Sequence, residues 1–388
     1  MASVQKRLGK DGVRWLARVR RHGHPEQTRT FDTKAAADSW TRAVEREMDT
    51  GSFIPSDAAT HLTFAKAAER YKEEALPRLR GKAQAEYVVN RVVEHFGKYS
   101  LALITPQLLS EYRDARLRVV APQTVTHELS MISRIFKLAA MDWGIALPKG
   151  NPVDLTRKPA ISNDRNRRLV GDEEARLMTA LLGRESPWPH AAAVLALETA
   201  ARQGELLALK WSEVDLDRRT ARLRGRDGGV TKNGDEWRDV PLSSIAVNLL
   251  KSLPRSTSAR ILPISQNALQ IAWGRAMRAA RKAHVYDKLR EHLATAGYDE
   301  QAQDREVRAI EYKKRKPLQL TFELLDKIEV DDMTLVDFHF HDLRHEATSR
   351  LADKLQMHEL MKVTGHKTSR MVSRYYHPRA EDLARKLD

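Results

Sequence analysis

The chain has 388 residues, 41% of them hydrophobic and 31% charged, which excludes a disordered polymer and allows two or three folded domains. It contains no cysteine, which excludes disulfides, a thiol nucleophile and cysteine ligands for zinc or an iron–sulfur cluster. Lysine and arginine number 67 against 52 acidic residues, and this net charge of +15, spread along the chain, favours a polyanionic partner.

The N-terminal part, residues 1–55, is predicted to be a small three-stranded sheet with one helix. Between residues 4 and 31, segments of alternating polarity are separated by turn signals such as Gly9–Gly12. Thr33 is a suitable cap for a helix from about Lys34 to Thr50. One face of the sheet is mostly basic, which suits a sheet that follows DNA phosphates, with an ordinary solvated face as the alternative. The candidate DNA-binding residues are Lys6, Arg7, Lys10, Arg14, Arg18, Arg20 and Arg21.

Residues 62–155 are predicted to form a compact unit of four helices. A linker is expected over residues 51–62, and apolar residues then recur at helical spacing in four segments. The predicted helices begin at Thr63, at Lys82, at Thr105 with a proline in the first turn, and at about Gln123. A second linker is predicted over residues 158–168, which are rich in basic residues and show no periodicity.

The last predicted domain covers residues 169–388 and is mainly helical with a small β-hairpin. Helices are expected over Asp172–Leu182 and His190–Thr199. Strands are expected over Thr220–Leu223 and Arg238–Leu242, with Lys232 in the turn between them. The sequence therefore predicts an α+β, multidomain fold.

Four motifs in the last domain combine residue types that suit chemistry on an anion. They are Arg202-Gln-Gly-Glu205, Lys232-Asn-Gly234, His341-Asp-Leu-Arg344-His345, and Gly365-His366 followed by Arg374-Tyr375-Tyr376. Taken singly, an Arg–Glu pair at this spacing is typical of a helix surface, and a hairpin lysine or a tyrosine pair has ordinary structural explanations. His341 and His345 have the spacing of a zinc-binding helix. No metal site is predicted, because Arg344 would place a fixed cation beside the ion and no third ligand follows.

In this order the motifs resemble those of the tyrosine recombinase family, the phage-type site-specific integrases. The resemblance covers nearly the whole chain and implies an arm-type DNA-binding domain in residues 1–55, a core-binding domain in 62–155 and a catalytic domain in 169–388. It implies that the catalytic residues are Arg202, Lys232, His341, Arg344, His366 and Tyr375, with Glu205 orienting the arginines. Tyr375 lies nine residues after His366, the spacing found in the family, so Tyr376 is the second choice of nucleophile.

Two features depart from the family pattern. Ala200 stands where the family usually has glycine, which affects a turn but no catalytic group. About fifty residues, over 283–336, precede the His341 motif, more than is usual, and they include the basic run Lys313–Lys316. Three interpretations of this charged insert stay open: an additional DNA contact, a partner surface, or a solvated excursion.

The residue types suit transfer of a phosphoryl group. Guanidinium groups such as those of Arg202 and Arg344 hold phosphate oxygens bidentately and keep their charge, and His366 can add a hydrogen bond. The resemblance implies that Tyr375 becomes joined to the DNA 3′-phosphate while Lys232 protonates the departing 5′-oxygen. His341 is expected to act as a base or a phosphate ligand. Because the bond energy stays in the protein–DNA link, no ATP, metal or other cofactor is expected.

The resemblance implies a site-specific recombinase that integrates or excises a mobile element. Its expected partners are double-stranded attachment sites and its own copies, four on DNA with a monomer when free. DNA-bending and directionality factors are further candidates, and residues 378–388 are expected to pack either on their own domain or on a neighbouring copy. A type IB topoisomerase-like enzyme and a catalytically silent DNA-binding regulator are the alternatives. No apolar run approaches a membrane span and no secretory signal begins the chain, so we expect a cytoplasmic, nucleoid-associated protein without a membrane partner.

Overall fold

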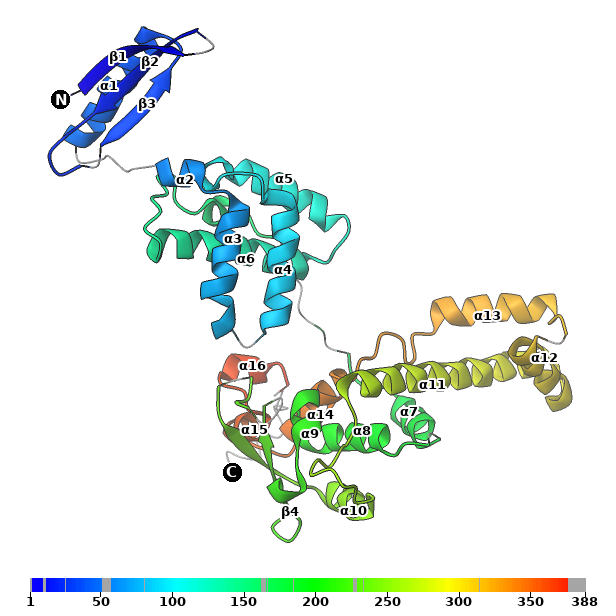
Figure 1. Cartoon of the computed structure of the whole chain (residues 1–388). Coiled ribbons are helices and arrows are strands. Elements are labelled where there is room, and N and C mark those ends of the chain that lie inside the picture. Colours follow the sequence, from blue (N-terminus) through cyan, green and yellow to red (C-terminus); the bar gives the residue numbers. More distant parts are fainter. Residues whose placement is uncertain are drawn as a thin grey trace, which may run out of the picture. The chain divides into compact units, whose positions relative to one another are not determined.

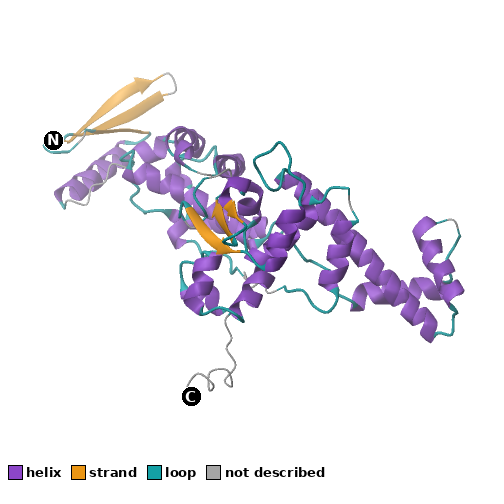
Figure 2. Ribbon diagram, turned by 90° about the horizontal axis from the view of Figure 1, so that it is seen from below, coloured by secondary structure: helices purple, strands orange, loops and turns teal. Residues whose placement is uncertain are grey.

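The computed structural model describes residues 2–9, 12–24, 26–50, 57–79, 81–161, 165, 167–183, 185–225, 229–232, 234–313 and 315–375. It divides into two compact units, Met1–Asn163 and Asp164–Asp388. Helices dominate the described ranges, and strands gather in two small antiparallel sheets (Figure 2). The predicted α+β, multidomain fold is confirmed. Within those ranges, no helix combines the length and the apolar character needed to cross a lipid bilayer.

The first sheet is a three-stranded meander covered by one helix (Figure 1). Its strands are β1 (Ala2–Gly9), β2 (Gly12–Val19) and β3 (Gln27–Phe31), and the helix is α1 (Lys34–Asp49). The Thr33 hydroxyl caps α1 by accepting a hydrogen bond from the backbone N–H of Ala36. Val19 of β2 packs against Val44 and Met48 of α1, which fixes the face of the sheet that the helix covers.

The helical module that follows is built around a continuous aromatic and aliphatic core. Its helices are α2 (Asp57–His61), α3 (Phe64–Glu74), α4 (Lys82–Phe96), α5 (Pro106–Leu117) and α6 (Pro122–Met141), with 3₁₀ turns at Leu76–Arg78, Leu101–Leu103 and Pro152–Leu155. At its centre the ring of Phe64 lies 6.1 Å from that of Phe96 and 6.4 Å from that of Phe136, measured between centroids. The prediction of a linker over residues 51–62 is wrong for α2, because its Ala59 is buried in this core and anchors the short helix.

The C-terminal unit surrounds a buried central helix, α8 (Trp188–Thr199). The helices that pack on it are α7 (Glu173–Leu182), α9 (Gln203–Ala208), α10 (Ser244–Ser252), α11 (Gln266–Thr295) and α14 (Asp342–Ala352). The unit also contains the 3₁₀ turn Trp211–Glu213, β4 (Val214–Asp215), β5 (Thr220–Arg224), β6 (Trp237–Pro241), α15 (Met357–Thr364) and α16 (Ser369–Ser373). The predicted hairpin corresponds to β5 and β6, and the short β4, which the sequence analysis did not include, pairs with β5. Small alanine side chains on α8 allow this close packing from all sides.

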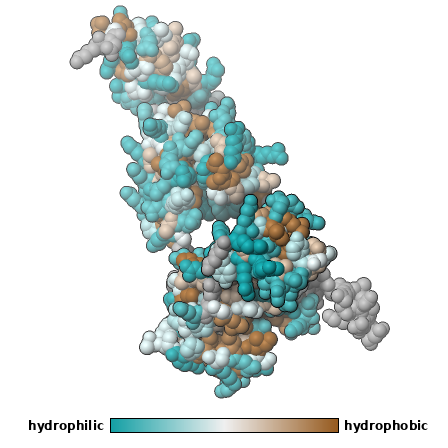
Figure 3. All heavy atoms as spheres, turned by 90° about the vertical axis from the view of Figure 1, so that its right-hand side faces the viewer, coloured by the Kyte–Doolittle hydropathy of each residue, from teal (hydrophilic) through white to brown (hydrophobic). Residues whose placement is uncertain are grey.

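The insert over residues 283–336 has its own hydrophobic core. It consists of the second half of α11 together with α12 (Glu300–Tyr312) and α13 (Gln319–Asp331). Leu289 and Leu293 of α11 pack with Val307 of α12 and Ile328 of α13. Buried Glu306 accepts hydrogen bonds from the Thr321 hydroxyl and the Leu318 N–H, both at 2.8 Å. The surface over α12 and α13 that faces the viewer in Figure 3 is mainly hydrophilic, with isolated apolar spots.

Candidate active site

The predicted basic residues of the N-terminal sheet do not all share one face. Arg7 lies opposite Arg14 in the register, and Arg18 alternates with the buried Ala17 and Val19, so these three arginines lie on the face away from α1. Lys6 lies opposite Trp15 and therefore lies on the other face.

Arg18 and two further arginines, Arg20 and Arg21, are paired with acidic side chains near the end of β2. Arg18 and Arg20 both contact Glu26, at 2.9 and 2.6 Å, and Arg21 contacts Asp49. Such exposed ion pairs are weak, which leaves these cations able to exchange partners with a phosphate. Lys10, which belongs to the same predicted set, lies outside the described residues.

Arg344 connects three separate segments of the C-terminal unit. It lies in the first turn of α14 and is only 5% exposed. Its guanidinium donates to the backbone carbonyl of Ala200 and, at 2.6 Å, to that of Thr364. These carbonyls lie two residues before Arg202 and two residues before His366. Arg344 therefore holds both of those motifs in place, in addition to supplying charge.

Arg202 is oriented by a buried carboxylate. Oε1 of Glu205 accepts from the Arg202 guanidinium at 2.8 Å, and Oε2 accepts from the Arg202 backbone N–H at 3.0 Å. The same Oε2 accepts at 2.6 Å from Arg238 on β6. Burial would raise the pKa of Glu205, but the charge of Arg238 and the contacts with Arg202 outweigh it and hold that pKa below its ordinary value. Glu205 is therefore ionised and fixes two cations at once.

Arg238 is a site residue that sequence reasoning missed. Its side chain is buried, Nη1 donates to the carbonyl of Val363 on α15, and burial lowers its pKa in spite of the Glu205 carboxylate. The alternating burial along β6 places residue 238 on the inner face of the strand. An arginine at an inward position of an amphipathic strand is the signal that could have identified it, because a buried charge needs a partner.

Ala200 adopts the backbone conformation that favours glycine. It ends α8 with φ at 51°, in the left-handed region, and its side chain is fully buried. The turn directs its carbonyl to Arg344 and lets the chain enter α9 at Arg202. Alanine at this position therefore forms the same turn that glycine would form, but its backbone is strained.

Tyr375 lies beside two histidine rings. The chain turns after α16, where the backbone N–H of Tyr375 donates to the carbonyl of Val372 at 2.8 Å, and the side chain packs on the cluster of Ala352, Leu360 and Val372. The ring stacks with His345 at 5.7 Å and with His366 at 6.3 Å between centroids. The phenol oxygen forms a hydrogen bond with Nδ1 of His345. Tyr376 and residues 378–388 lie outside the described residues.

The protonation of His366 follows from its neighbour. The Thr364 hydroxyl donates its hydrogen to the carbonyl of Leu360 at 2.6 Å, so its oxygen accepts from Nδ1–H of His366 at 2.7 Å. Burial and the charges of Arg344 and Arg202 lower the pKa of His366 to about 4, which leaves Nε2 unprotonated at pH 7. A phosphate anion bound beside the ring would raise this pKa and allow Nε2–H to donate.

His341 and Lys232 lie at the open side of the site. His341 is exposed at the start of α14, and its ring centroid is 5.4 Å from that of His345. Displacement of water from its ring, together with the charges of Arg344, Lys232 and Arg202, lowers its pKa in spite of Asp342. Lys232 is exposed in the turn between β5 and β6, close enough for its charge to act on His341.

Arginines of the second predicted linker bind the elements that carry the site. Arg165 binds both oxygens of buried Asp342 at 2.7 Å, beside His341, and its carbonyl accepts from Arg374, beside Tyr375. The boundary between the two units falls within the linker predicted over residues 158–168, and these contacts fix the C-terminal end of that segment. No pattern in the sequence could indicate these contacts, because the partners lie more than 170 residues away.

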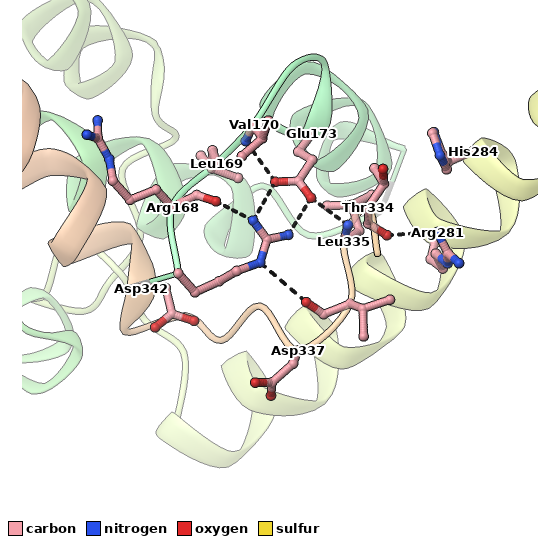
Figure 4. Close-up of polar contacts among 12 residues, drawn as sticks. Arg168, Leu169, Val170, Glu173, Arg281, His284, Thr334, Leu335, Asp337 and Asp342 are labelled. Carbon is pink, nitrogen blue, oxygen red and sulfur yellow. Dashed lines mark hydrogen bonds and ion pairs between the residues drawn. The ribbon is translucent and has the colours of Figure 1, made fainter. Parts of the chain in front are cut away.

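A second ionic contact fixes the loop before His341. Glu173 on α7 accepts from the backbone N–H of Val170 at 2.9 Å and from that of Leu335 at 2.6 Å, and also binds Arg167 (Figure 4). Leu335 and Asp337 have left-handed backbone conformations, with φ at 58° and 48°. The ionic contacts thus hold a strained loop whose end is the His341 motif.

The cations of this site can hold one anion beside the phenol of Tyr375. The three arginines Arg202, Arg238 and Arg344 lie close enough to influence one another. Burial, followed by the charges of Arg202 and Arg238, lowers the pKa of Arg344, and burial with the charges of all three lowers the pKa of His366. Burial raises the pKa of Tyr375, against the charges of Arg374 and Arg344. The phenol is therefore protonated at pH 7, and its attack on a phosphate needs a base that takes the proton.

Known proteins are similar to this chain in sequence and in fold. The sequence pattern of the phage integrase family matches residues 167–382. A shufflon-specific DNA recombinase of Escherichia coli is 30% identical over 350 residues, which cover 86% of this chain and 74% of the recombinase. A solved lambda integrase dimer bound to a COC′ core site covers 99% of this chain and 96% of its own, with a TM-score of 0.58 and 17% identity. A lambda integrase tetramer bound to a Holliday junction covers 94% of this chain and 96% of its own, with a TM-score of 0.55 and 16% identity. The family match spans more than half of the sequence, and this chain belongs to the phage integrase family of tyrosine recombinases.

Proposed function

We propose that this chain is a site-specific DNA recombinase that cuts and rejoins DNA through a 3′-phosphotyrosyl link and so integrates or excises a mobile element. The observation that carries the proposal is the position of the Tyr375 phenol, which stacks on His366 and lies within the field of Arg344, while Arg202 and Arg344 both act on His366. A phosphodiester repels nucleophiles, and guanidinium groups around its nonbridging oxygens stabilise the charge that develops in the transition state.

Each site residue has a role in this proposal. Arg202 and Arg344 bind the nonbridging oxygens, with Arg202 oriented by Glu205. The Tyr375 oxygen forms the bond to phosphorus, and the bond to the 5′-oxygen breaks. That oxygen takes its proton from Lys232, whose exposed position on a hairpin lets it reach the DNA. His366 and His341 complete the set as phosphate ligands, His366 after the anion has raised its pKa. The steps require no ATP and no metal.

The proposal extends to the partners. Two strands in each of two duplexes must be cut, so we infer four copies around paired attachment sites and a monomer when free; the tetrameric lambda integrase assembly supports this. The basic face of the first sheet, with Arg7, Arg14 and Arg18, suits contact with DNA phosphates at separate arm sites. Accessory factors that bend DNA and set the direction of the reaction complete the proposed assembly.

A nicked duplex provides the test. The attachment site is taken from the repeated core in the DNA that flanks the gene, and a nick close to the cleavage position lets a short fragment leave, which traps the covalent complex. The wild-type chain should form an adduct with DNA that survives detergent, and Tyr375→Phe should abolish it. Tyr376→Phe should retain it, and so should Tyr312→Phe, a control at an exposed residue of α12.

The alternatives predict different results from the same samples. A catalytically silent regulator would bind the duplex in a salt-dependent manner and form no adduct. A topoisomerase-like enzyme would form the adduct and relax supercoiled plasmids without exchanging strands between two sites. An adduct that persists in Tyr375→Phe and disappears in Tyr376→Phe would transfer the role of nucleophile to the neighbouring residue.

A further inference from the structure

We propose that His345 is the general base that takes the phenol proton of Tyr375 when the tyrosine attacks DNA. The inference rests on the proposed function and adds a catalytic residue to it. Its starting point is the hydrogen bond between Nδ1 of His345 and the Tyr375 oxygen, the atom that would bond to phosphorus. A group that touches the reacting oxygen in this way meets the geometric requirement for a base.

The fold brings these two side chains together from different elements. His345 lies on α14, one turn after His341, and Tyr375 follows α16. The buried cluster of Ala352, Leu360 and Val372 joins α14, α15 and α16 directly beneath the tyrosine ring. The hydrogen bond is therefore supported by packing on its apolar side, and the stacked rings limit rotation of both side chains.

The charge state of His345 suits a residue that accepts a proton. Burial, together with the repulsion from His341 when that ring is protonated and from Arg374, lowers its pKa to about 4, so the ring is neutral at pH 7 in spite of Asp342. A neutral imidazole with its proton on Nε2 presents a lone pair at Nδ1, and the phenol donates to it. The other two histidines are less suitable: Nδ1–H of His366 donates to Thr364, and His341 lies on the exposed side of the site.

The proposed step is balanced in protons and bonds. As the bond from the Tyr375 oxygen to phosphorus forms, the phenol proton passes to Nδ1 of His345, and the electron pair of the breaking bond leaves with the 5′-oxygen, which Lys232 protonates. The bound phosphate brings negative charge to the pocket and raises the affinity of the imidazole for the proton. In rejoining, the His345 imidazolium returns the proton to the departing tyrosine oxygen.

The test separates the base from the leaving-group acid. His345→Asn keeps an acceptor near the position of Nδ1 but cannot take a proton, and it should slow single-turnover cleavage of the nicked duplex by about 10²–10⁴-fold. Replacing Tyr375 with a trifluorotyrosine, whose phenol is much more acidic, should restore most of this loss. A 5′-bridging phosphorothiolate, whose sulfur leaves without a proton, should rescue Lys232→Ala and leave His345→Asn slow.

Control variants distinguish the loss of a base from a general structural defect. His358→Asn, at an exposed histidine of α15, should cleave at the wild-type rate. DNA affinity and melting temperature of His345→Asn should match the wild type, and His345→Ala should show the same rescue by the acidic tyrosine even if its packing is weaker. His366→Asn should not be rescued in this way, because its role is assigned to the phosphate.

Several outcomes would overturn the inference while the proposed function stands. Two of them concern the rate of His345→Asn, which could cleave as fast as the wild type or could be rescued by the phosphorothiolate. The other two concern the acidic tyrosine, which could fail to restore the cleavage rate of His345→Asn or could restore that of His366→Asn instead. Failure of the wild-type chain to form any adduct with the nicked duplex would instead reject the recombinase function, and the assignment of His345 with it.

Discussion

Replacement of Glu205 by glutamine should destabilise the C-terminal unit strongly. The carboxylate is 2% exposed and binds the guanidinium groups of Arg202 and Arg238 at 2.8 and 2.6 Å. Glutamine has the same shape but no charge, and its amide nitrogen faces one of the two cations. Arg238 would then be buried without a counter-ion, and removal of one partner from a buried pair costs about 3–5 kcal/mol.

Urea unfolding of the full-length chain, followed by tryptophan fluorescence and circular dichroism, measures this loss in the transition of the C-terminal unit. Arg238→Met supplies the second arm of a double-mutant cycle, because it removes the cation that lacks a partner. The double variant should be more stable than Glu205→Gln alone. Glu94→Gln is the matched control: its ion pair with Arg91 is exposed, and its loss should change stability by less than about 0.5 kcal/mol.

The reasoning is refuted if Glu205→Gln costs less than about 1 kcal/mol, since such a cost is typical of an exposed ion pair and not of a buried one. Additive effects of the two single variants would also contradict it, because residues that share a buried charge pair must couple.

Three further predictions follow from contacts around the site. Arg165→Ala should reduce the cleavage rate by about 10- to 100-fold with a smaller effect on DNA affinity, since the residue positions Asp342 beside His341; equal losses in rate and affinity would contradict this. Ala200→Val should destabilise the chain by about 2–3 kcal/mol in urea unfolding, because a β-branched side chain in a buried left-handed turn is strained, whereas Ala200→Gly should be tolerated. The pKa values of His345 and His366, about 4 in the folded chain, lie below the ordinary 6.5, so the unfolded chain binds more protons and stability should fall as pH drops from about 6.5 to 4; a profile that stays just as steep after both are replaced by asparagine would reject this.

The sequence predicted best what depends on local pattern. Caps such as Thr33 and Thr105, strand alternation and helical spacing were sufficient to locate most elements, because these signals act over a few residues. The motifs around Arg202, Arg344 and Tyr375 were identified from spacing, but their meeting in space depends on Arg344 and the carbonyls of distant segments. Their catalytic roles stay predictions.

What the sequence could not indicate arises from long-range charge pairing. The pattern predicts a strand at Arg238, but its bond to Glu205 of α9 joins residues 33 positions apart and forms only in the folded chain. Arg165 lies in the predicted linker, and its contact with Asp342 cannot be predicted from local pattern for the same reason. For the insert the sequence leaves three interpretations open, because α12 and α13 each contribute one fully buried apolar residue to its core, Val307 and Ile328, too few to indicate a buried face.

The helix α11 connects the insert mechanically to the catalytic loop. It has 30 residues and therefore spans about 45 Å, long enough to serve two separate cores. One half anchors α12 and α13, and the other carries Trp273, whose indole donates to the carbonyl of Phe338 at 3.4 Å and whose ring lies 5.1 Å from that of Phe340, next to His341. Because the same continuous helix serves both cores, a displacement of its outer end would be transmitted along α11 to the loop that precedes His341.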